Sequence, residues 1–342
     1  MDTAALDMAS VPSAGHTLTL RDRLGAARVR LGIGRDRYAV QPGLYRCGDP
    51  GPDAPVLVTA NYKLTFDHVR SQVAGIDAWL LVLDTRGVNV WCAAGKNTFG
   101  TVELSRRVID TGLANVVDHR TLIVPQLGAT GVAAHDVRAF TGFKVVWGPV
   151  RATDIPEFLR RGMQATPAMR RVTFTLKERL TLVPVELSAL WRPGVLGALA
   201  VLGLTSGLGV WGFSAKALQA RGAAVVLAAL SGWIAGAVVT PALLPAVPGR
   251  AFAAKGALVG TVAGFGVFAG SVQGVGPLAG AAVSLATVTL ASYVAMNFTG
   301  ASTFTSLSGV LHEMRRALPW QLGGAFLAAV LWVASALLGR GW

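Results

Sequence analysis

Four long stretches without a charged residue make up most of the second half of the chain. They cover residues 193–215, 222–249, 256–311 and 317–339. A helix needs about 20 consecutive apolar residues to cross the hydrocarbon core of a bilayer. The third stretch is long enough for two helices, with a turn near Gly274-Val275-Gly276-Pro277. The pattern therefore predicts an all-α membrane domain over residues 193–342.

Five spans are expected in this domain, and the alternative is four, with one stretch lying at the surface or re-entering. We place the spans at about residues 194–214, 223–245, 253–272, 276–296 and 318–338. No Asp, Glu, Lys or Arg is expected inside a span, which argues against an active transporter. Small residues allow helices to pack closely in lipid, and glycines recur here at Gly256, Gly260, Gly264, Gly266 and Gly270.

Basic residues near the ends of the spans predict the orientation, because cytoplasmic loops are enriched in Lys and Arg. Lys216 and Arg221 lie on the opposite side in a five-span arrangement, but they are outnumbered. We therefore expect a multi-pass protein of the inner, cytoplasmic membrane of the cell, with the N-terminal domain in the cytoplasm. The residues that support this orientation are Arg170, Arg171, Lys177, Arg179, Arg192, Arg250, Lys255, Arg315 and Arg316.

Residues 55–165 alternate between strand and helix patterns. Strands are expected at residues 56–60, 79–84, 88–91, 121–124 and 144–147, and helices at 65–73, 99–111, 132–140 and 154–163. This alternation predicts an open, Rossmann-like α/β sheet whose strands are largely parallel. We place an N-terminal extension before it, at residues 1–54, and a connector after it, at 166–192. Ligands of such sheets bind beyond the carboxyl ends of the strands.

The chain has two cysteines, Cys47 and Cys92. Two are too few for an iron–sulfur cluster, which normally takes four thiolates, and for a disulfide framework. A pair of free thiols fits a reducing compartment. Cys92 lies between an apolar strand pattern and a predicted helix, and Lys96 follows it. Both neighbours favour the thiolate, which is the nucleophilic and metal-binding form.

The residues around Cys92 can be tested against the sequence requirements of several known kinds of site. A phosphate-binding loop would need Gly at position 90 and Ser or Thr at position 97, where the chain has Val90 and Asn97. A zinc site is disfavoured because the histidines are scattered rather than at ligand spacing from Cys92. A Cys–His nucleophile and a cysteine that only packs in the core both remain open.

The run Asn-Val-Trp-Cys-Ala-Ala-Gly-Lys at residues 89–96 resembles the signature of the membrane-bound corrinoid protein of microbial mercury methylation. That family is related to the corrinoid iron–sulfur protein of the acetyl-CoA pathway. The resemblance extends to residues 56–63, 99–101 and 297–300. It covers roughly residues 55–165 and the membrane half. It implies a cytoplasmic corrinoid-binding domain followed by about five spans.

The resemblance implies a corrinoid-dependent methyltransferase, which transfers a methyl group from cysteine-ligated methyl-Co(III) to Hg(II) and forms methylmercury. Cys92 would be the catalytic residue and the axial ligand of the cobalt of cobalamin. The other residues implied to contact the cofactor are Asn89, Val90, Trp91, Ala93, Ala94, Gly95 and Lys96 beneath the ring, and Thr59, Asn61, Gln126 and Gly128 at its edge.

The resemblance also implies partners. The chain would hold no iron–sulfur cluster of its own and would receive electrons from a ferredoxin-like protein with two 4Fe–4S clusters. A methyltetrahydrofolate-linked donor would supply the methyl group. Membrane lipid is an expected partner and nucleic acid is not. Two alternatives stay open: a corrinoid methyl carrier with a different acceptor, and a non-catalytic, membrane-anchored binding or scaffold protein.

Overall fold

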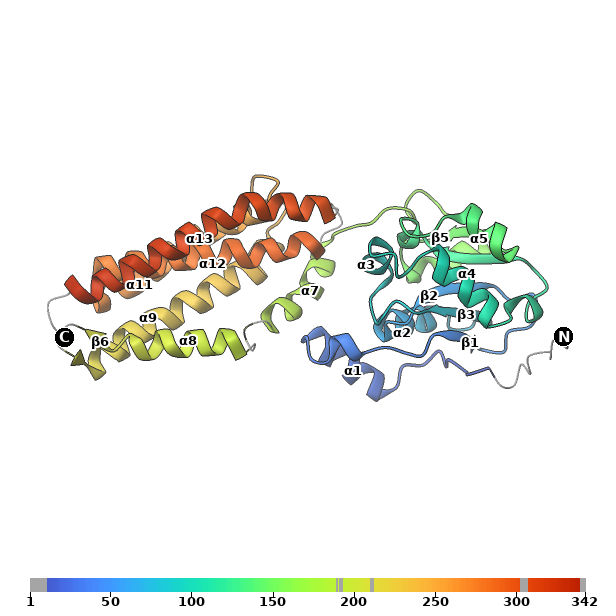
Figure 1. Cartoon of the computed structure of the whole chain (residues 1–342), viewed down its shortest axis with the longest axis horizontal. Coiled ribbons are helices and arrows are strands. Elements are labelled where there is room, and N and C mark those ends of the chain that lie inside the picture. The colour runs from blue at the N-terminus through green and yellow to red at the C-terminus, as the bar shows by residue number, and fades with distance from the viewer. Residues whose placement is uncertain (1–10, 189, 191–192, 210–211, 302–306, 339–342) are drawn as a thin grey trace. The chain divides into compact units, whose positions relative to one another are not determined.

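The computed structural model describes residues 11–188, 190, 193–209, 212–301 and 307–338. The chain divides into two compact units, Met1–Val172 and Thr173–Trp342 (Figure 1). Parts of three expected elements lie outside the described residues: positions 1–10 of the N-terminal extension, positions 189, 191 and 192 of the connector, and positions 210 and 211 of the first span.

A five-stranded sheet forms the centre of the first unit. Four strands are parallel, and β1 pairs antiparallel with β3 at one edge. The order is β1-β3-β2-β4-β5, which confirms the predicted α/β sheet with largely parallel strands. The strands are β1 (Gly43–Cys47), β2 (Val56–Ala60), β3 (Ala78–Leu83), β4 (Thr121–Pro125) and β5 (Lys144–Gly148).

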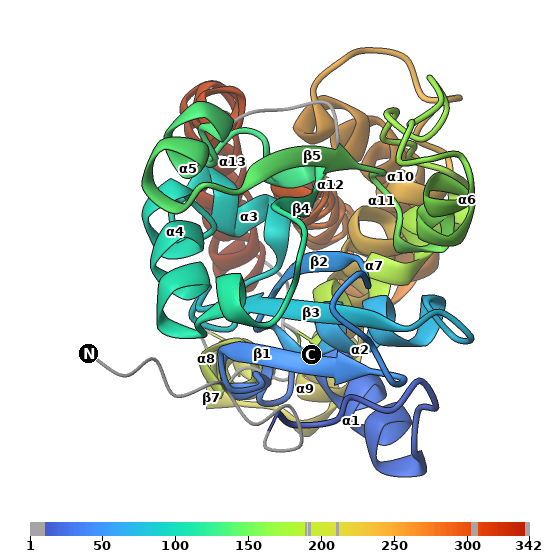
Figure 2. The ribbon, with the colours of Figure 1, turned by 90° about the vertical axis from the view of Figure 1, so that its right-hand side faces the viewer.

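Helices cover both faces of this sheet (Figure 2). On one face lie α3 (Val90–Gly95), α4 (Thr101–Asp110) and α5 (Ala134–Thr141), and on the other lie α2 (Lys63–Gln72) and α6 (Ile155–Arg160). Alternate residues of a strand point to opposite faces. Val58 therefore packs in a core with Leu104, whereas Leu57 packs in a second core with Phe66 and Phe158. Burial on both faces explains why these strands are continuous apolar runs.

Two segments of the first unit differ from the sequence-based expectation. The strand predicted at residues 88–91 is wrong, because Asn89 caps α3 and the chain is helical from Val90. Within the expected extension, residues 1–54, the chain forms α1 (Leu20–Arg30) and the edge strand β1. Short 3₁₀ turns complete the unit at Arg35–Arg37, Leu113–Asn115, Gln126–Gly128 and Ala152–Asp154.

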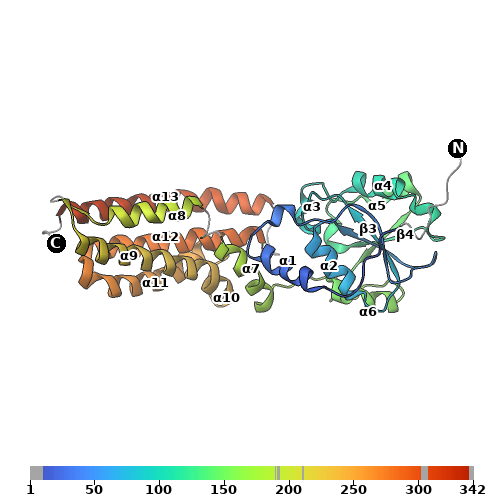
Figure 3. The same cartoon turned by 90° about the horizontal axis from the view of Figure 1, so that it is seen from below.

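The second unit is helical, and its longest helices lie alongside one another (Figure 3). Four helical segments are long and apolar enough to cross a membrane, and a bent pair, α7 with α8, could make a fifth. The four segments are Ala215–Ala242, Phe252–Val275, Pro277–Gly300 and Ser308–Leu338. The elements are α7 (Leu176–Ser188), α8 (Pro193–Thr205), β6 (Leu208–Gly209), β7 (Gly212–Phe213), α9 (Ala215–Ile234), a π-helical segment (Ala235–Val239), α10 (Thr240–Ala242), α11 (Phe252–Val275), α12 (Pro277–Ala301) and α13 (Leu307–Leu338).

The first predicted span, residues 194–214, does not form one continuous helix. Helix α8 ends at Thr205 after 13 residues, and β6 pairs with β7 in a short hairpin. A helix of that length rises only about 20 Å, which is shorter than the hydrocarbon core of about 30 Å. A fifth crossing would therefore need α7, a helix that begins in the predicted connector, residues 166–192.

Helices α11 and α12 pack closely along one row of glycines. A Cβ atom added at Gly256 would lie 2.5 Å from the Cβ of Ala295, and one added at Gly260 would lie 2.7 Å from the Cβ of Ala291. Gly264 faces α12 in the same way, while a Cβ atom added at Gly266 would meet nothing within 4 Å. The expected glycine packing is therefore confirmed for the row 256, 260, 264.

Arg221, which was expected in a loop between the first two predicted spans, lies within helix α9. Its side chain is 2% exposed within α9. The guanidinium donates to Ser335 Oγ at 3.0 Å and to the carbonyl of Trp332 at 2.9 Å, and it lies 3.9 Å from the centroid of the Trp332 ring. Charged residues set the limits of the predicted spans, so that reasoning could not place an arginine that lies within a helix and bonds a neighbouring one.

Candidate functional site

The candidate site lies at the carboxyl edge of the sheet, between β2 and β4. The chain leaves β2 toward β3 on one side, and after β3 it crosses to β4 on the other side. Such a reversal opens a crevice beyond the carboxyl ends of the strands. A cavity of about 310 Å³ is found there, bordered by β2, β4, α2, the start of α3 and residues 148–155.

Helix α3 presents Cys92 at this edge. The side chain of Asn89 caps the helix, and its Oδ1 accepts a hydrogen bond of 2.9 Å from the backbone N–H of Cys92. Ala93 and Ala94 are buried in the core beneath the helix. Cys92 precedes them on the outward side, so its thiol is exposed.

A buried hydroxyl without a partner lines the cavity. Thr59, near the end of β2, is 1% exposed, and its Oγ1 has no hydrogen-bond partner among the residues that the structure describes. An unsatisfied buried hydroxyl costs about 1–3 kcal/mol. A ligand with an acceptor or donor atom in the cavity would recover that energy. Asn89, Val90 and Trp91 of the cysteine run line the same cavity.

Asn61 positions the approach to α3 rather than lining the cavity. Its buried Oδ1 accepts from the backbone N–H groups of Thr85 and Gly87 and from the hydroxyl of Thr85, at 2.8–3.1 Å. Its Nδ2 donates to Asp84 Oδ1 at 3.2 Å. The side chain therefore holds the turn 84–88, from which the chain enters α3.

The remaining predicted contacts lie around α3 but do not border the cavity. Gln126 accepts a hydrogen bond of 2.6 Å from Arg170. Gly128 is buried against Phe99, since a Cβ there would lie 2.5 Å from the Phe99 ring. Gly95 and Lys96 are exposed at the far end of α3. The structure thus gathers Thr59 and Asn89–Trp91 at one cavity, and Cys92 follows Trp91 in α3 without bordering the cavity itself.

One face of α2 contributes residues that sequence reasoning missed. Thr65, His68 and Val69 line the cavity from the helix that follows β2. Part of the His68 side chain reaches solvent. The pKa of His68 is lowered mainly by the burial of the rest of the side chain and further by the positive charge of Arg30. The imidazole is therefore neutral at physiological pH. The i, i+3, i+4 spacing after a strand end was a signal that could have identified this face.

The second cysteine has the opposite environment. Cys47 is completely buried, and its Sγ lies 3.3 Å from Nδ1 of His16. Burial raises the pKa of Cys47 to about 11. Cys47 is therefore a protonated core residue, and Cys92 is the thiol that can meet a ligand.

Comparison with known proteins gives relatives for this part of the chain. Residues 34–159 match the family described as CO dehydrogenase/acetyl-CoA synthase delta subunit. The gamma subunit of the acetyl-CoA decarbonylase/synthase complex of Methanopyrus kandleri is 37% identical over 129 residues, which are 37% of this chain and 28% of that protein. The subunit from Archaeoglobus fulgidus is 36% identical over 129 residues, covering 37% and 27%. The subunit from Methanocaldococcus jannaschii is 34% identical over 128 residues, covering 37% and 26%.

The chain thus spans between a quarter and a third of the length of these curated relatives. The family match ends at residue 159, before the first helix of the second unit. It includes the sheet, the cavity and Cys92. Residues 34–159, which carry the candidate site, are therefore related to subunits of the acetyl-CoA decarbonylase/synthase complex.

Proposed function

We propose that the first unit binds a corrinoid such as cobalamin, with Cys92 as the axial ligand of its cobalt, and that the protein carries and transfers methyl groups. The observation that carries this proposal is the exposed Cys92 thiol on α3, a helix whose first residues line a cavity that also holds an unpartnered Thr59 hydroxyl. The similarity to acetyl-CoA decarbonylase/synthase subunits and the motif at residues 89–96 support it.

The residues present fit such a group. A corrin ring supplies the equatorial ligands of its own metal, so the protein needs to add only one thiolate. Cys92 is exposed, and so are Gly95 and Lys96 on the same short helix and its C-cap, so a ligand can approach the thiol from solvent. The cavity of about 310 Å³ is too small for a whole corrinoid but has room for one of its side groups, which Thr59 could hydrogen-bond.

Each residue then has a distinct task. The corrinoid, when bound, supplies a metal that accepts and releases a methyl group, and the protein supplies orientation and electronics. Cys92 as a thiolate would donate electron density to the metal, which favours release of the methyl group as a carbanion equivalent. Asn89 fixes the first turn of α3, and Asn61 fixes the turn before it. Val90 and Trp91 would exclude water at the rim of the cavity.

For the acceptor we propose Hg(II), which is soft and electrophilic and would give methylmercury. The support is the resemblance of residues 89–96 to the mercury-methylation family. The same resemblance supports a methyltetrahydrofolate-linked donor and an electron-donating, ferredoxin-like partner with two 4Fe–4S clusters. The basic residues near the apolar helices support a cytoplasmic position for the first unit.

The decisive experiment uses the full chain reconstituted with cobalamin under reducing conditions. The absorption spectrum and the yield of methylmercury are compared for wild type, Cys92→Ala and, as the matched control, Cys47→Ala. We expect Cys92→Ala to lose both the thiolate-ligated spectrum and methyl transfer, and Cys47→Ala to keep both. A full yield from Cys92→Ala would disprove the role of Cys92. Failure of wild type to bind cobalamin would leave a non-catalytic scaffold.

The second candidate function keeps the corrinoid and changes the acceptor. It is favoured by the relatives, which are subunits of a complex named for acetyl-CoA chemistry rather than for mercury. The methylated protein can be offered Hg(II), other thiophilic ions and a protein-bound metal centre in parallel. Transfer to a protein-bound centre without transfer to Hg(II) would favour this second function.

A further inference from the structure

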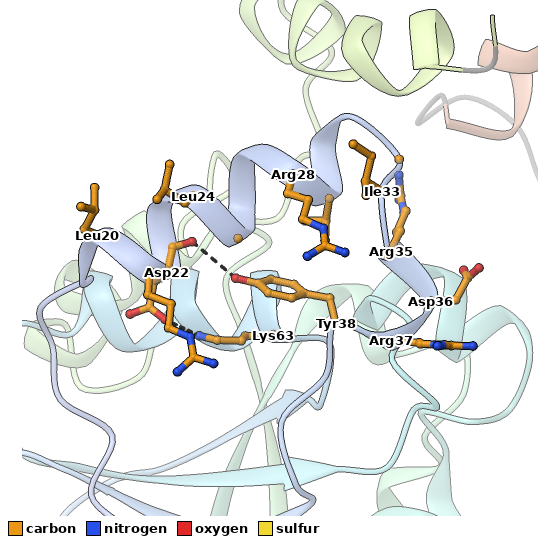
Figure 4. A pocket seen from close by; sticks show the side chains of 15 residues that line it. Leu20, Asp22, Leu24, Arg28, Ile33, Arg35, Asp36, Arg37, Tyr38 and Lys63 are labelled. Atoms are coloured by element: carbon orange, nitrogen blue, oxygen red, sulfur yellow. Dashed lines mark hydrogen bonds and ion pairs between the residues drawn. The ribbon is translucent and has the colours of Figure 1, made fainter. Parts of the chain in front are cut away.

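Helix α1 carries an exposed apolar strip that the candidate site does not use. Residues 20, 24, 27 and 31 fall on one side of a helix with 100° between residues. Leu20 is 72% exposed and Leu24 is 63% exposed, and Ala27, Leu31 and Ile33 are also exposed. Figure 4 shows Leu20 and Leu24 pointing away from the rest of the unit. Leu20 and Leu24, with Leu31 at the C-cap, thus form one exposed apolar strip along the helix.

Arginines flank this strip on both sides. By the same helical geometry, Arg21 and Arg28 lie along one side, and Arg23 and Arg30 lie along the other. All four are exposed, and within the described part of the chain none forms an ion pair. Arg35 and Arg37 extend the positive charge into the following turn.

The inner face of α1 fixes this arrangement. The Asp22 carboxylate accepts from Lys63 at 2.6 Å and from Arg70 at 2.8 Å. Val29 is buried, and the Tyr38 hydroxyl donates to the carbonyl of Asp22. The strip therefore belongs to a helix that is held in place, not to a loose end. A hollow of about 1210 Å³ runs along α1 and is lined by Leu20, Leu24 and Arg28 among others, and Arg28 extends toward Tyr38 (Figure 4).

We propose that α1, through Leu20, Leu24 and Leu31 and the four flanking arginines, binds the surface of an anionic lipid bilayer. An interfacial helix combines an apolar strip, which enters the acyl boundary, with basic residues that meet the headgroups. α1 has this composition, and its one acidic side chain, Asp22, is turned inward and neutralised. The chain also carries four helices apolar enough to cross a membrane. A bilayer that these helices cross would be linked to α1 through the same chain and would therefore be present at high effective concentration.

The number of basic residues on α1 sets how strongly binding should depend on the charge of the bilayer. A basic residue near an anionic surface strengthens binding by about fivefold. Four exposed arginines therefore distinguish an anionic bilayer from a neutral one. An acidic protein surface or a second copy of the chain would be the competing occupants, and the experiment below separates them from lipid.

The test uses the full chain in lipid nanodiscs, with a polarity-sensitive dye on Ala27→Cys. Cys92→Ala is the background, because Cys92 is exposed and would also be labelled, whereas Cys47 is buried. Neutral nanodiscs are compared with nanodiscs that contain phosphatidylglycerol, each with a quencher attached to the lipid tails. We expect quenching and a blue shift in the anionic nanodiscs. The matched control is a dye on Val102→Cys, which is 80% exposed on α4, and it should stay unquenched.

Variants identify the groups responsible. Arg21→Gln with Arg23→Gln should shift the docking equilibrium away from lipid by roughly twentyfold, while thermal unfolding of the first unit stays unchanged. Leu20→Ser with Leu24→Ser should also release the dye. An unquenched dye at position 27 in anionic nanodiscs would overturn the proposal, and so would equal quenching in neutral ones. A dye shielded from a water-soluble quencher but not reached by the lipid quencher would point to a protein occupant and also overturn it.

Discussion

The two units of the chain place their polar side chains in opposite ways. In the first unit, polar residues gather at the carboxyl edge of a sheet, where Thr59, Asn61 and Asn89 surround one cavity and its approach. In the second unit, helices α11 and α12 meet through glycines, and single polar side chains bond a neighbouring helix, as Arg221 does through two hydrogen bonds to α13. Chemistry is therefore expected at the sheet edge, while the helical unit depends on close backbone contact.

The physical reason lies in how each architecture satisfies its backbone. A helix completes its own backbone hydrogen bonds, so helices can approach wherever side chains are small. A parallel sheet ends in turns whose N–H groups have no ladder partner. In the first unit these N–H groups are satisfied by a buried side chain, Asn61, which accepts from Thr85 and Gly87.

The largest effect is expected from Asn61→Ala in the first unit. The change leaves the N–H groups of Thr85 and Gly87 without their acceptor, while the Thr85 hydroxyl can still donate to the carbonyl of Val88. We expect the free energy of unfolding of this unit to fall by about 3 kcal/mol. Denaturant unfolding measures it, with the exposed Asn115→Ala as the control. A loss below about 0.5 kcal/mol would show that the turn does not depend on this amide.

The next largest effect is expected in the second unit, where a substitution at a glycine tests how closely α11 and α12 pack. In Gly256→Ala the new methyl group would lie 2.5 Å from the Cβ of Ala295 and 2.6 Å from the carbonyl oxygen of Ala291. We expect the pair of helices α11 and α12 to lose about 2 kcal/mol of stability, measured by unfolding in bicelles. Gly266→Ala is the matched control, because nothing lies within 4 Å of its Cβ position. Equal behaviour of the two variants would contradict close packing along this row.

The smallest effect is a pH dependence confined to the first unit. Burial alone would raise the pKa of Asp22, but hydrogen bonds from Lys63, Thr19 and Arg70 outweigh it and lower that pKa. A carboxyl group with a lowered pKa stabilises the folded state above its unfolded pKa of about 3.9, and that stabilisation is lost as the pH falls further. We expect a loss of about 1 kcal/mol on acidification below about pH 4.

Thermal unfolding of wild type and Asp22→Asn at several pH values measures this effect. The variant should already be less stable at neutral pH and should lose less on acidification. If both proteins showed the same acid dependence, the Asp22 ion pairs would not hold α1 to the unit.

Some local features misled or escaped sequence reasoning for identifiable reasons. Residues 88–91 alternate like a strand, but the Asn89 cap starts a helix there. Strand β1 is short and joins the sheet through β3, a partner far along the chain. Arg221 precedes an uncharged stretch and so was placed in a loop, although it lies in α9 and donates to Ser335 and Trp332. In each case the deciding partner is distant in sequence or is a single capping side chain.

The sequence by itself determined that the chain pairs an α/β sheet with a set of apolar helices, because strand alternation and the length of uncharged stretches are local properties. It also singled out Cys92 through the run at residues 89–96. Only the tertiary structure decided that Cys92 is exposed while Cys47 is buried, that Asn61 turns inward, and that Thr59 lacks a partner among the described residues. Burial and hydrogen bonding depend on atoms brought together from distant parts of the chain, and no local pattern encodes them.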